Sequence, residues 1–208
     1  YETTGNIRAA VVKGNLIMMA NEAEQSFEIL QIVNRNSTTV RGSTGIYGEP
    51  IGLVEDEDIV CLLDEDIGLR LVNAGDTDDP MFTGTFPITG QSRDITRYDK
   101  RILIANSEGL IAITIKNYPA IREEGRYTNF EINPVKVYGY GTYAGVLLED
   151  GTIYLMDLKF ASDIRVSLKI DPDDSVGGIH LFYDYMSLAL NNNLKIIDYQ
   201  VKSLKQNE

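Results

Sequence analysis

Apolar residues alternate along this chain with the two-residue period of β-strands. No window of about 12 residues carries the i, i+3, i+4, i+7 stripe of an amphipathic helix. Short runs rich in Val, Ile, Leu and Tyr are bounded instead by Gly, Asn, Asp and Pro, which is typical of strands and turns. In residues 110–115, Leu110, Ala112 and Thr114 fall on one face and three isoleucines on the other. Because both faces are mostly apolar, this segment is predicted to be a strand inside a stack of sheets.

A unit of four short strands recurs about every 41 to 44 residues. The first strands of the units are expected to begin near Ile7, Ile51, Asp94, Val135 and Ile179. A second strand follows a charged or Gly-containing turn, and a third follows a tight acidic or Asn-rich turn. A fourth, more polar strand ends four of the units. This spacing is that of a propeller blade, so the sequence predicts an all-β, five-bladed β-propeller of four-stranded blades that forms a single domain over residues 1–208.

The ends of the chain bear on how such a propeller closes. A blade cannot bury both of its faces alone, and stacking blades around an axis buries them. The fifth unit ends in residues 201–208, which leave its outer strand incomplete. One hypothesis is that Tyr1–Thr4 completes the fifth blade and closes the ring. The alternative is that the five units were cut from a longer propeller, since the chain opens with Tyr1 rather than Met.

The sequences of the predicted third strands resemble the LVIVD-type repeats of bacterial and archaeal β-propellers. The residues that carry the resemblance are LKIIDY at 194–199, IYLMDL at 153–158, LRLVNAGDTDDP at 69–80 and LIAITIKNYP at 110–119. The repeat Asp is replaced by Asn73 and Thr114 in two units. Proteins with such repeats are mostly extracellular or on the cell surface, so the resemblance implies that location for this chain.

Charge and cysteine content exclude several function classes. The net charge is −12, which repels nucleic-acid phosphates and anionic lipids, so no nucleic-acid partner is expected. No apolar run approaches the roughly 18 residues of a membrane span. Cys61 is the only cysteine and lies in an apolar run. We expect it to be a buried core thiol, which leaves no intrachain disulfide.

Acidic loops are the most prominent candidate for metal chemistry. Calcium needs six to eight oxygen ligands in a compact loop. The segments DTDDP and DPDDS place carboxylates at their first, third and fourth positions; these are Asp76, Asp78, Asp79, Asp171, Asp173 and Asp174. Neither segment has the Gly and distal Glu of a complete calcium loop. Solvated turn acids are therefore the expectation, and calcium is the alternative; no other cofactor is expected.

A second candidate site lies on the predicted first strands, which line the centre of a propeller. Arg8, Lys136 and His180 each follow a blade-opening position, and Asp94 is an acid at such a position. We hypothesise an axial pocket for an anion or another polar ligand. Tyr138 and Tyr140 in the segment VYGYGTYAG belong to the same candidate site. Tyrosine is favoured in recognition surfaces because it offers area and a hydrogen bond at little entropic cost.

These features together favour a non-enzymatic binding or scaffold module that recognises a protein or a polar small molecule, in a surface or secreted protein. Two alternatives stay open. One is a glycosidase-like hydrolase that uses carboxylates at the axial funnel. The other is a purely structural repeat domain of a larger assembly. The sequence carries no catalytic motif that decides for an enzyme.

Overall fold

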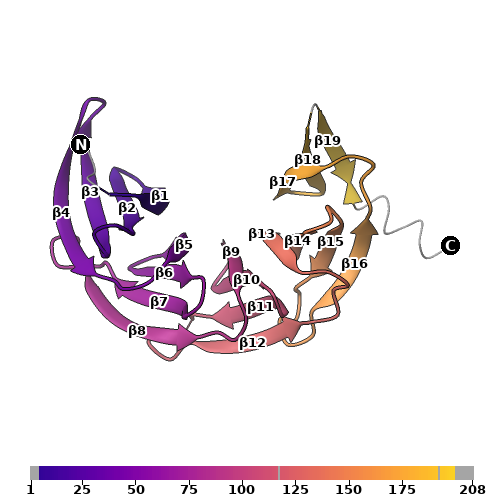
Figure 1. Cartoon of the computed structure of the whole chain (residues 1–208), viewed down its shortest axis with the longest axis horizontal. Coiled ribbons are helices and arrows are strands. Elements are labelled where there is room, and N and C mark those ends of the chain that lie inside the picture. The colour runs from indigo at the N-terminus through magenta and orange to yellow at the C-terminus, as the bar shows by residue number, and fades with distance from the viewer. Residues whose placement is uncertain (1–4, 117, 192, 200–208) are drawn as a thin grey trace. The chain divides into compact units, whose positions relative to one another are not determined.

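The structure is a computed structural model that describes residues 5–116, 118–191 and 193–199. Its strands form sheets in which neighbours in the sequence are neighbours in space (Figure 1). The chain divides into two compact units, residues 1–92 and residues 93–208.

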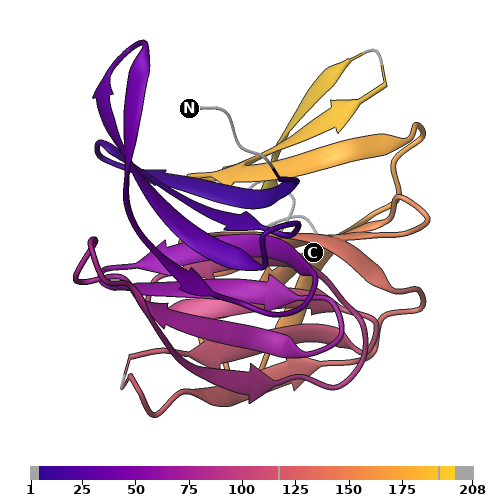
Figure 2. The same ribbon diagram turned by 60° about the vertical axis from the view of Figure 1, so that its left-hand side comes forward.

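The first unit contains two four-stranded antiparallel sheets. The first sheet consists of β1 (Ile7–Lys13), β2 (Leu16–Asn21), β3 (Ser26–Asn34) and β4 (Ser37–Gly45). The second consists of β5 (Pro50–Asp56), β6 (Ile59–Asp64), β7 (Gly68–Asn73) and β8 (Met81–Pro87). The hairpin of β3 and β4 is longer than the others and projects beyond its own sheet (Figure 2).

The second unit contains three sheets within its described residues. The first consists of β9 (Ser92–Tyr98, which begins at the unit boundary), β10 (Arg101–Asn106), β11 (Gly109–Thr114) and β12 (Arg122–Tyr127). The next consists of β13 (Pro134–Tyr140), β14 (Tyr143–Leu148), β15 (Ile153–Asp157) and β16 (Arg165–Ile170). The last consists of β17 (Val176–Phe182), β18 (Tyr185–Leu190) and β19 (Leu194–Asp198).

Two-residue turns join the first and second strands of all five described sheets. The first residue of each turn has a left-handed backbone, with φ between 48° and 61°; these residues are Gly14, Glu57, Asp99, Gly141 and Tyr183. Such turns match the right-handed twist of the paired strands, and glycine and aspartate are the residues that adopt them most readily. The turn therefore fixes which residues of the first and second strands face each other.

A second turn device recurs between the second and third strands. The side-chain oxygens of Asn21, Asp64 and Asn106 accept hydrogen bonds of 2.8–3.3 Å from backbone N–H groups two or three residues further on. All three side chains are buried at the end of a strand. Asn and Asp are favoured in turns for this reason, which accounts for the Asn-rich and acidic turns in the sequence.

One of these turn residues also takes part in a buried ion pair. Asp64 Oδ2 lies 3.3 Å from Arg70 Nη2, and the two side chains are 4% and 8% exposed. Gly48 covers the pair with φ +117°, and a Cβ there would lie 2.1 Å from Asp64 Oδ2. Only glycine fits at that position, because it accepts the backbone angle and leaves room for the pair.

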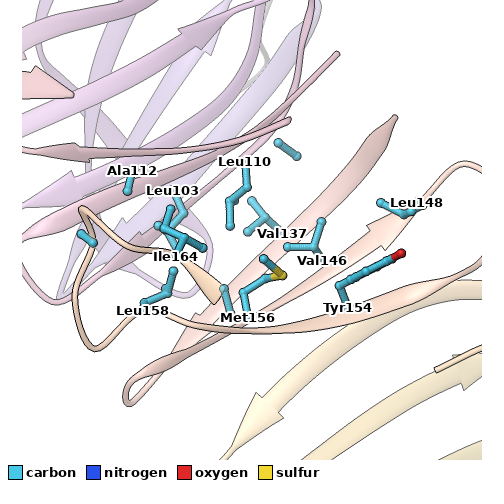
Figure 3. Packing of buried hydrophobic residues seen from close by; sticks show 13 residues of the cluster. Leu103, Leu110, Ala112, Val137, Val146, Leu148, Tyr154, Met156, Leu158 and Ile164 are labelled. Atoms are coloured by element: carbon cyan, nitrogen blue, oxygen red, sulfur yellow. The ribbon is translucent and has the colours of Figure 1, made fainter. Parts of the chain in front are cut away.

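Apolar faces of neighbouring sheets pack together within each unit. In the first unit, Phe27 and Ile29 of β3 join Leu62 and Val72 of the next sheet in one buried cluster. In the second unit, Leu103 and Leu110 pack against Val137, Val146 and Met156 (Figure 3). Burying one such side chain contributes about 1.5–3 kcal/mol relative to leaving it exposed. The strand at 110–115 is buried on both faces, as its pattern predicted.

The predicted all-β class is confirmed. First strands begin at Ile7, Pro50, Ser92, Pro134 and Val176, at the predicted starts or up to three residues before them. A register shift near the start of β1, β5, β13 and β17 inserts an extra residue that the sequence pattern did not reveal. The segment Tyr1–Thr4, which was predicted to close the ring, and residues 201–208 at the end of the fifth unit lie outside the described residues. Ring closure and a single domain over 1–208 therefore stay predictions.

Candidate aromatic binding site

Aromatic side chains gather on two neighbouring hairpins of the second unit, β13–β14 and β17–β18. Ring centroids lie 4.2 Å apart between Tyr138 and His180, 6.1 Å between His180 and Phe182, and 5.7 Å between Phe182 and Tyr185. We call this set, with Tyr140 and Tyr183, the aromatic surface. Tyr140 and Tyr183 meet edge to face with centroids 5.8 Å apart. Such contacts hold the rings in fixed orientations.

The turn register explains why Tyr138 meets His180. Each residue stands three positions before the left-handed residue of its own turn, Gly141 or Tyr183. They therefore occupy the same place on adjacent first strands. The Tyr138 hydroxyl lies 2.6 Å from His180 Nε2. A tyrosine hydroxyl is protonated at neutral pH, and burial, followed by the neighbouring Tyr140, raises the pKa of Tyr138 further.

A pocket of about 320 Å³ opens beside the aromatic surface. Its walls are the two hairpin turns and the residue after the last described strand: Tyr140, Gly141, Thr142, Tyr143, Tyr183, Asp184 and Tyr199. Tyr143 and Tyr199 contact each other edge to face, with ring centroids 5.3 Å apart. Four of these seven lining residues are tyrosines, and we call this hollow the tyrosine pocket.

Tyr199 anchors one side of this pocket. Its side chain is buried, its hydroxyl donates to the carbonyl of Tyr183, and its backbone N–H donates to the Asp184 carbonyl at 3.1 Å. Burial raises the pKa of Tyr199, and the negative charge of Asp184 adds to that shift. Tyr199 therefore fixes the backbone of the turn that carries Tyr183.

Tyr183 has an unusual backbone for its residue type. Its φ is +48° and its side chain is 75% exposed. A left-handed conformation costs a residue with a Cβ about 1–2 kcal/mol, and the equivalent positions of the other four described turns hold Gly, Glu or Asp. Tyr183 is therefore costly at this position and gains no burial in return, which marks it as a candidate functional residue.

The predicted residues Asp94 and Lys136 lie near each other in the second unit. Asp94 Oδ2 accepts a 2.9 Å hydrogen bond from the Val137 N–H, and Asp94 Oδ1 lies 3.9 Å from Lys136 Nζ. Burial raises the pKa of the Asp94 carboxyl, while the Val137 hydrogen bond and the Lys136 charge act in the opposite direction. Asp94 thus links the first strands of two adjacent sheets.

Arg8 belongs to the first unit and pairs with Glu22 at 2.6 Å. The structure also places Arg8, Lys136 and His180 of the predicted axial pocket at different points of their strands. Arg8 stands six residues before its turn, Lys136 five and His180 three. The sequence comparison aligned them on the strand starts, whereas the turns set the true register. The axial anion pocket stays a prediction. Of the predicted set, the structure brings Tyr138 and His180 into contact and places Asp94 close to Lys136, while Tyr140 contacts Tyr183.

The acidic loops form turns and ion pairs. Asp76 Oδ1 accepts the N–H of Asp78 at 3.0 Å, and Asp78 pairs with Arg41 at 2.7 Å. Asp171 lies 3.8 Å from Lys169, and Asp174 Oδ1 accepts the next backbone N–H at 3.0 Å. Within the described ranges, no three His, Cys, Asp or Glu side chains form a group that could hold a metal ion. Solvated turn acids stay the expectation for these loops, and calcium binding stays the untested alternative.

Other hollows of the second unit lie around Phe160. One of about 390 Å³ is lined mostly by charged residues, and these include the pair Arg101–Glu124. A smaller one of about 240 Å³ is lined in part by Asp163 and Arg165, which pair with each other. Because pairs at these borders are already satisfied, the tyrosine pocket is the better candidate for a ligand.

No family model matches the chain, and no curated protein resembles it significantly in sequence. Solved structures do resemble it in fold. The match to Sqt1 of Saccharomyces cerevisiae has a TM-score of 0.76 at 10% identity and covers 95% of this chain and 61% of that one. The match to the computationally designed Ika8 protein has a TM-score of 0.73 at 9% identity and covers 95% of this chain and 59% of that one.

A third similar structure is a β-propeller domain. The Cps50 (Swd1) β-propeller domain of Myceliophteria thermophila matches with a TM-score of 0.71 at 11% identity, over 94% of this chain and 69% of that domain. These similarities show that the chain has a β-propeller fold, and at such identities they show the fold alone. The chain spans about three fifths of the length of Ika8 and Sqt1.

None of the helical structure in the described residues is long and apolar enough to cross a membrane.

Proposed function

We propose that this chain is a non-enzymatic binding module that recognises a protein partner through the aromatic surface. One observation carries the proposal: contacting aromatic rings on adjacent hairpins frame a pocket, and Tyr183 is held exposed there at a conformational cost. Large rigid rings give contact area with little loss of side-chain entropy. A β-propeller offers a rigid scaffold for such hairpin turns, and binding residues are commonly found on turns of this kind.

The finer parts of the proposal rest on the sequence. We propose that the five repeats are blades of the LVIVD type and that the module belongs to a surface or secreted protein. The repeated third-strand sequences support the LVIVD type. The surface or secreted location follows from the resemblance to that type. A polar small molecule is the alternative ligand, and the net charge of −12 argues against nucleic acid.

A glycosidase would need two carboxyl groups about 5 to 10 Å apart across a cleft. Asp94 is the carboxyl with a raised pKa on a first strand, and its described partners are the Val137 N–H and Lys136. These contacts give Asp94 a role in joining two sheets. We therefore favour binding over hydrolysis.

Selection of peptides from a random displayed library against the whole chain tests the binding proposal. Enriched peptides are expected to bind the wild type and to lose affinity about tenfold or more when Tyr183→Asn or Tyr185→Ser removes an exposed ring. Tyr47→Asn is the matched control, since Tyr47 is also highly exposed but belongs to the first unit. Enriched peptides that bind the aromatic variants and the wild type equally, or no enrichment at all, would refute the proposal.

A further inference from the structure

The lining of the tyrosine pocket has a distinct electrostatic character. Four tyrosine rings and one carboxylate, that of Asp184, make up its wall together with Gly141 and Thr142. None of the described residues that line the pocket is cationic. The faces of aromatic rings are electronegative and attract cations, most strongly where water is partly excluded. The pocket wall is therefore suited to a positive group.

Neighbouring charges act in the same direction. Burial raises the pKa of Tyr199 most, and the nearby carboxylates of Asp184 and Asp198 add to that shift. The chain as a whole carries −12, which attracts basic partners over longer distances. A pocket of about 320 Å³ lies in the size range of known ligand pockets and accepts one long side chain.

Tyr183 completes the wall at the exposed rim. Its backbone is left-handed, a conformation that glycine or aspartate adopts more readily at this turn position. Its ring meets Tyr140 edge to face, and its carbonyl accepts the Tyr199 hydroxyl. The conformational cost of this arrangement is explained if the Tyr183 ring is needed to contact a ligand.

We infer that the tyrosine pocket binds the side chain of a lysine or arginine residue of the protein partner. The cation lies against the faces of the tyrosine rings, and the Asp184 carboxylate neutralises its charge. The inference rests on the proposed function, because it specifies what the aromatic surface recognises.

Titration of the whole chain with small amino-acid amides tests the pocket directly. The probes are Nα-acetyl-lysine methylamide, Nα-acetyl-arginine methylamide and, as an uncharged control of similar length, Nα-acetyl-norleucine methylamide. Ring-labelled tyrosine makes the pocket visible by NMR. We expect saturable shifts of tyrosine ring signals with the cationic probes, weaker binding at high salt, and no saturable shift with norleucine.

Variants assign the binding to the pocket. Tyr183→Asn and Asp184→Asn are each expected to weaken lysine-amide binding about three- to thirtyfold. Asn tolerates the left-handed backbone better than Tyr does, so Tyr183→Asn keeps or raises the melting temperature and its binding loss is not a folding effect. Tyr47→Asn is expected to leave binding unchanged. Equal binding of norleucine, or an equal loss in Tyr47→Asn, would overturn the inference.

Peptide selection separates this inference from the proposed function. If selected peptides need the aromatic surface but bind equally well after their lysines are acetylated and their arginines replaced by citrulline, the inference fails and the proposed function stands. If the cationic amides bind the pocket while no selected peptide depends on the aromatic surface, the pocket assignment holds and recognition of a protein partner fails.

Discussion

The buried pair Asp64–Arg70 provides the sharpest test of the structure of the first unit. At 3.3 Å, and with an effective dielectric constant of about 20, the two charges attract each other by about 5 kcal/mol before desolvation is counted. Asp64 Oδ2 and Arg70 Nε also find no hydrogen-bond partner among the residues that the structure describes. Asp64 Oδ1 accepts two turn N–H groups, but Arg70 supplies the positive charge beside the buried carboxylate, so each charge depends on the other.

Arg70→Met removes one partner and leaves the Asp64 carboxylate buried without its counter-charge. We expect this variant to lower the free energy of unfolding of the first unit by about 3–5 kcal/mol. Adding Asp64→Asn removes the remaining charge and keeps an oxygen that accepts the turn N–H groups of Asp66 and Ile67. The double variant is expected to return to within about 1 kcal/mol of the wild type.

Cys61 supplies a local assay for this cycle. It is the only cysteine of the chain, it is buried in β6, and it pairs with Leu71 next to Arg70. Urea unfolding is followed by circular dichroism and by the urea dependence of Cys61 alkylation, which reports the opening of this sheet. The reasoning is refuted if the double variant loses as much free energy of unfolding as Arg70→Met alone and Asp64→Asn alone lose in sum. It is also refuted if Arg70→Met lowers that free energy by less than about 1 kcal/mol.

Three further outcomes are expected. Because burial raises the folded-state pKa of Asp94, the stability that this carboxyl contributes is present below its unfolded pKa and is lost as pH rises through its folded pKa. Asp94→Asn should therefore gain stability relative to the wild type between acidic and neutral pH, by urea titration, and a relative loss at neutral pH would contradict this. Burial, with a smaller contribution from Asp56, raises the pKa of Cys61 to about 12, so iodoacetamide should not modify the native chain at pH 8 but should modify it fully in urea. Calcium and EDTA should leave the melting temperature unchanged, because acids of both loops are engaged in turns and ion pairs; a shift with calcium would show that it binds the folded state.

The recurring alternation of apolar and polar residues, bounded by turn residues, contained most of the information on the strands. Alternation and turn residues are local properties, so Leu110 to Ile115 could be recognised as a strand buried on both faces without knowledge of its neighbours. The same pattern indicated the repeat length and the all-β class. The strand starts were less well predicted, because the bulges near Pro50 and Pro134 depend on pairing with the next strand.

The candidate site was predicted only in part. Tyr138, Tyr140 and His180 were named from composition and position in the repeat, but their contacts depend on the register that the two-residue turns impose. The sequence alone had a signal for Tyr183 as well, since it occupies a turn position where the other repeats have Gly, Glu or Asp. That signal could be read only after the turns had been aligned.

The sequence by itself determined the strands, the repeat and the acidic charge of this protein, because each follows from neighbouring residues or from simple counts. Only the tertiary structure decided which side chains share a pocket and which charges are paired. Tyr143 and Tyr199 are 56 positions apart in the sequence, and they meet because adjacent sheets bury their apolar faces against each other. Burial between sheets selects one register and one set of neighbours, and no local pattern specifies that choice.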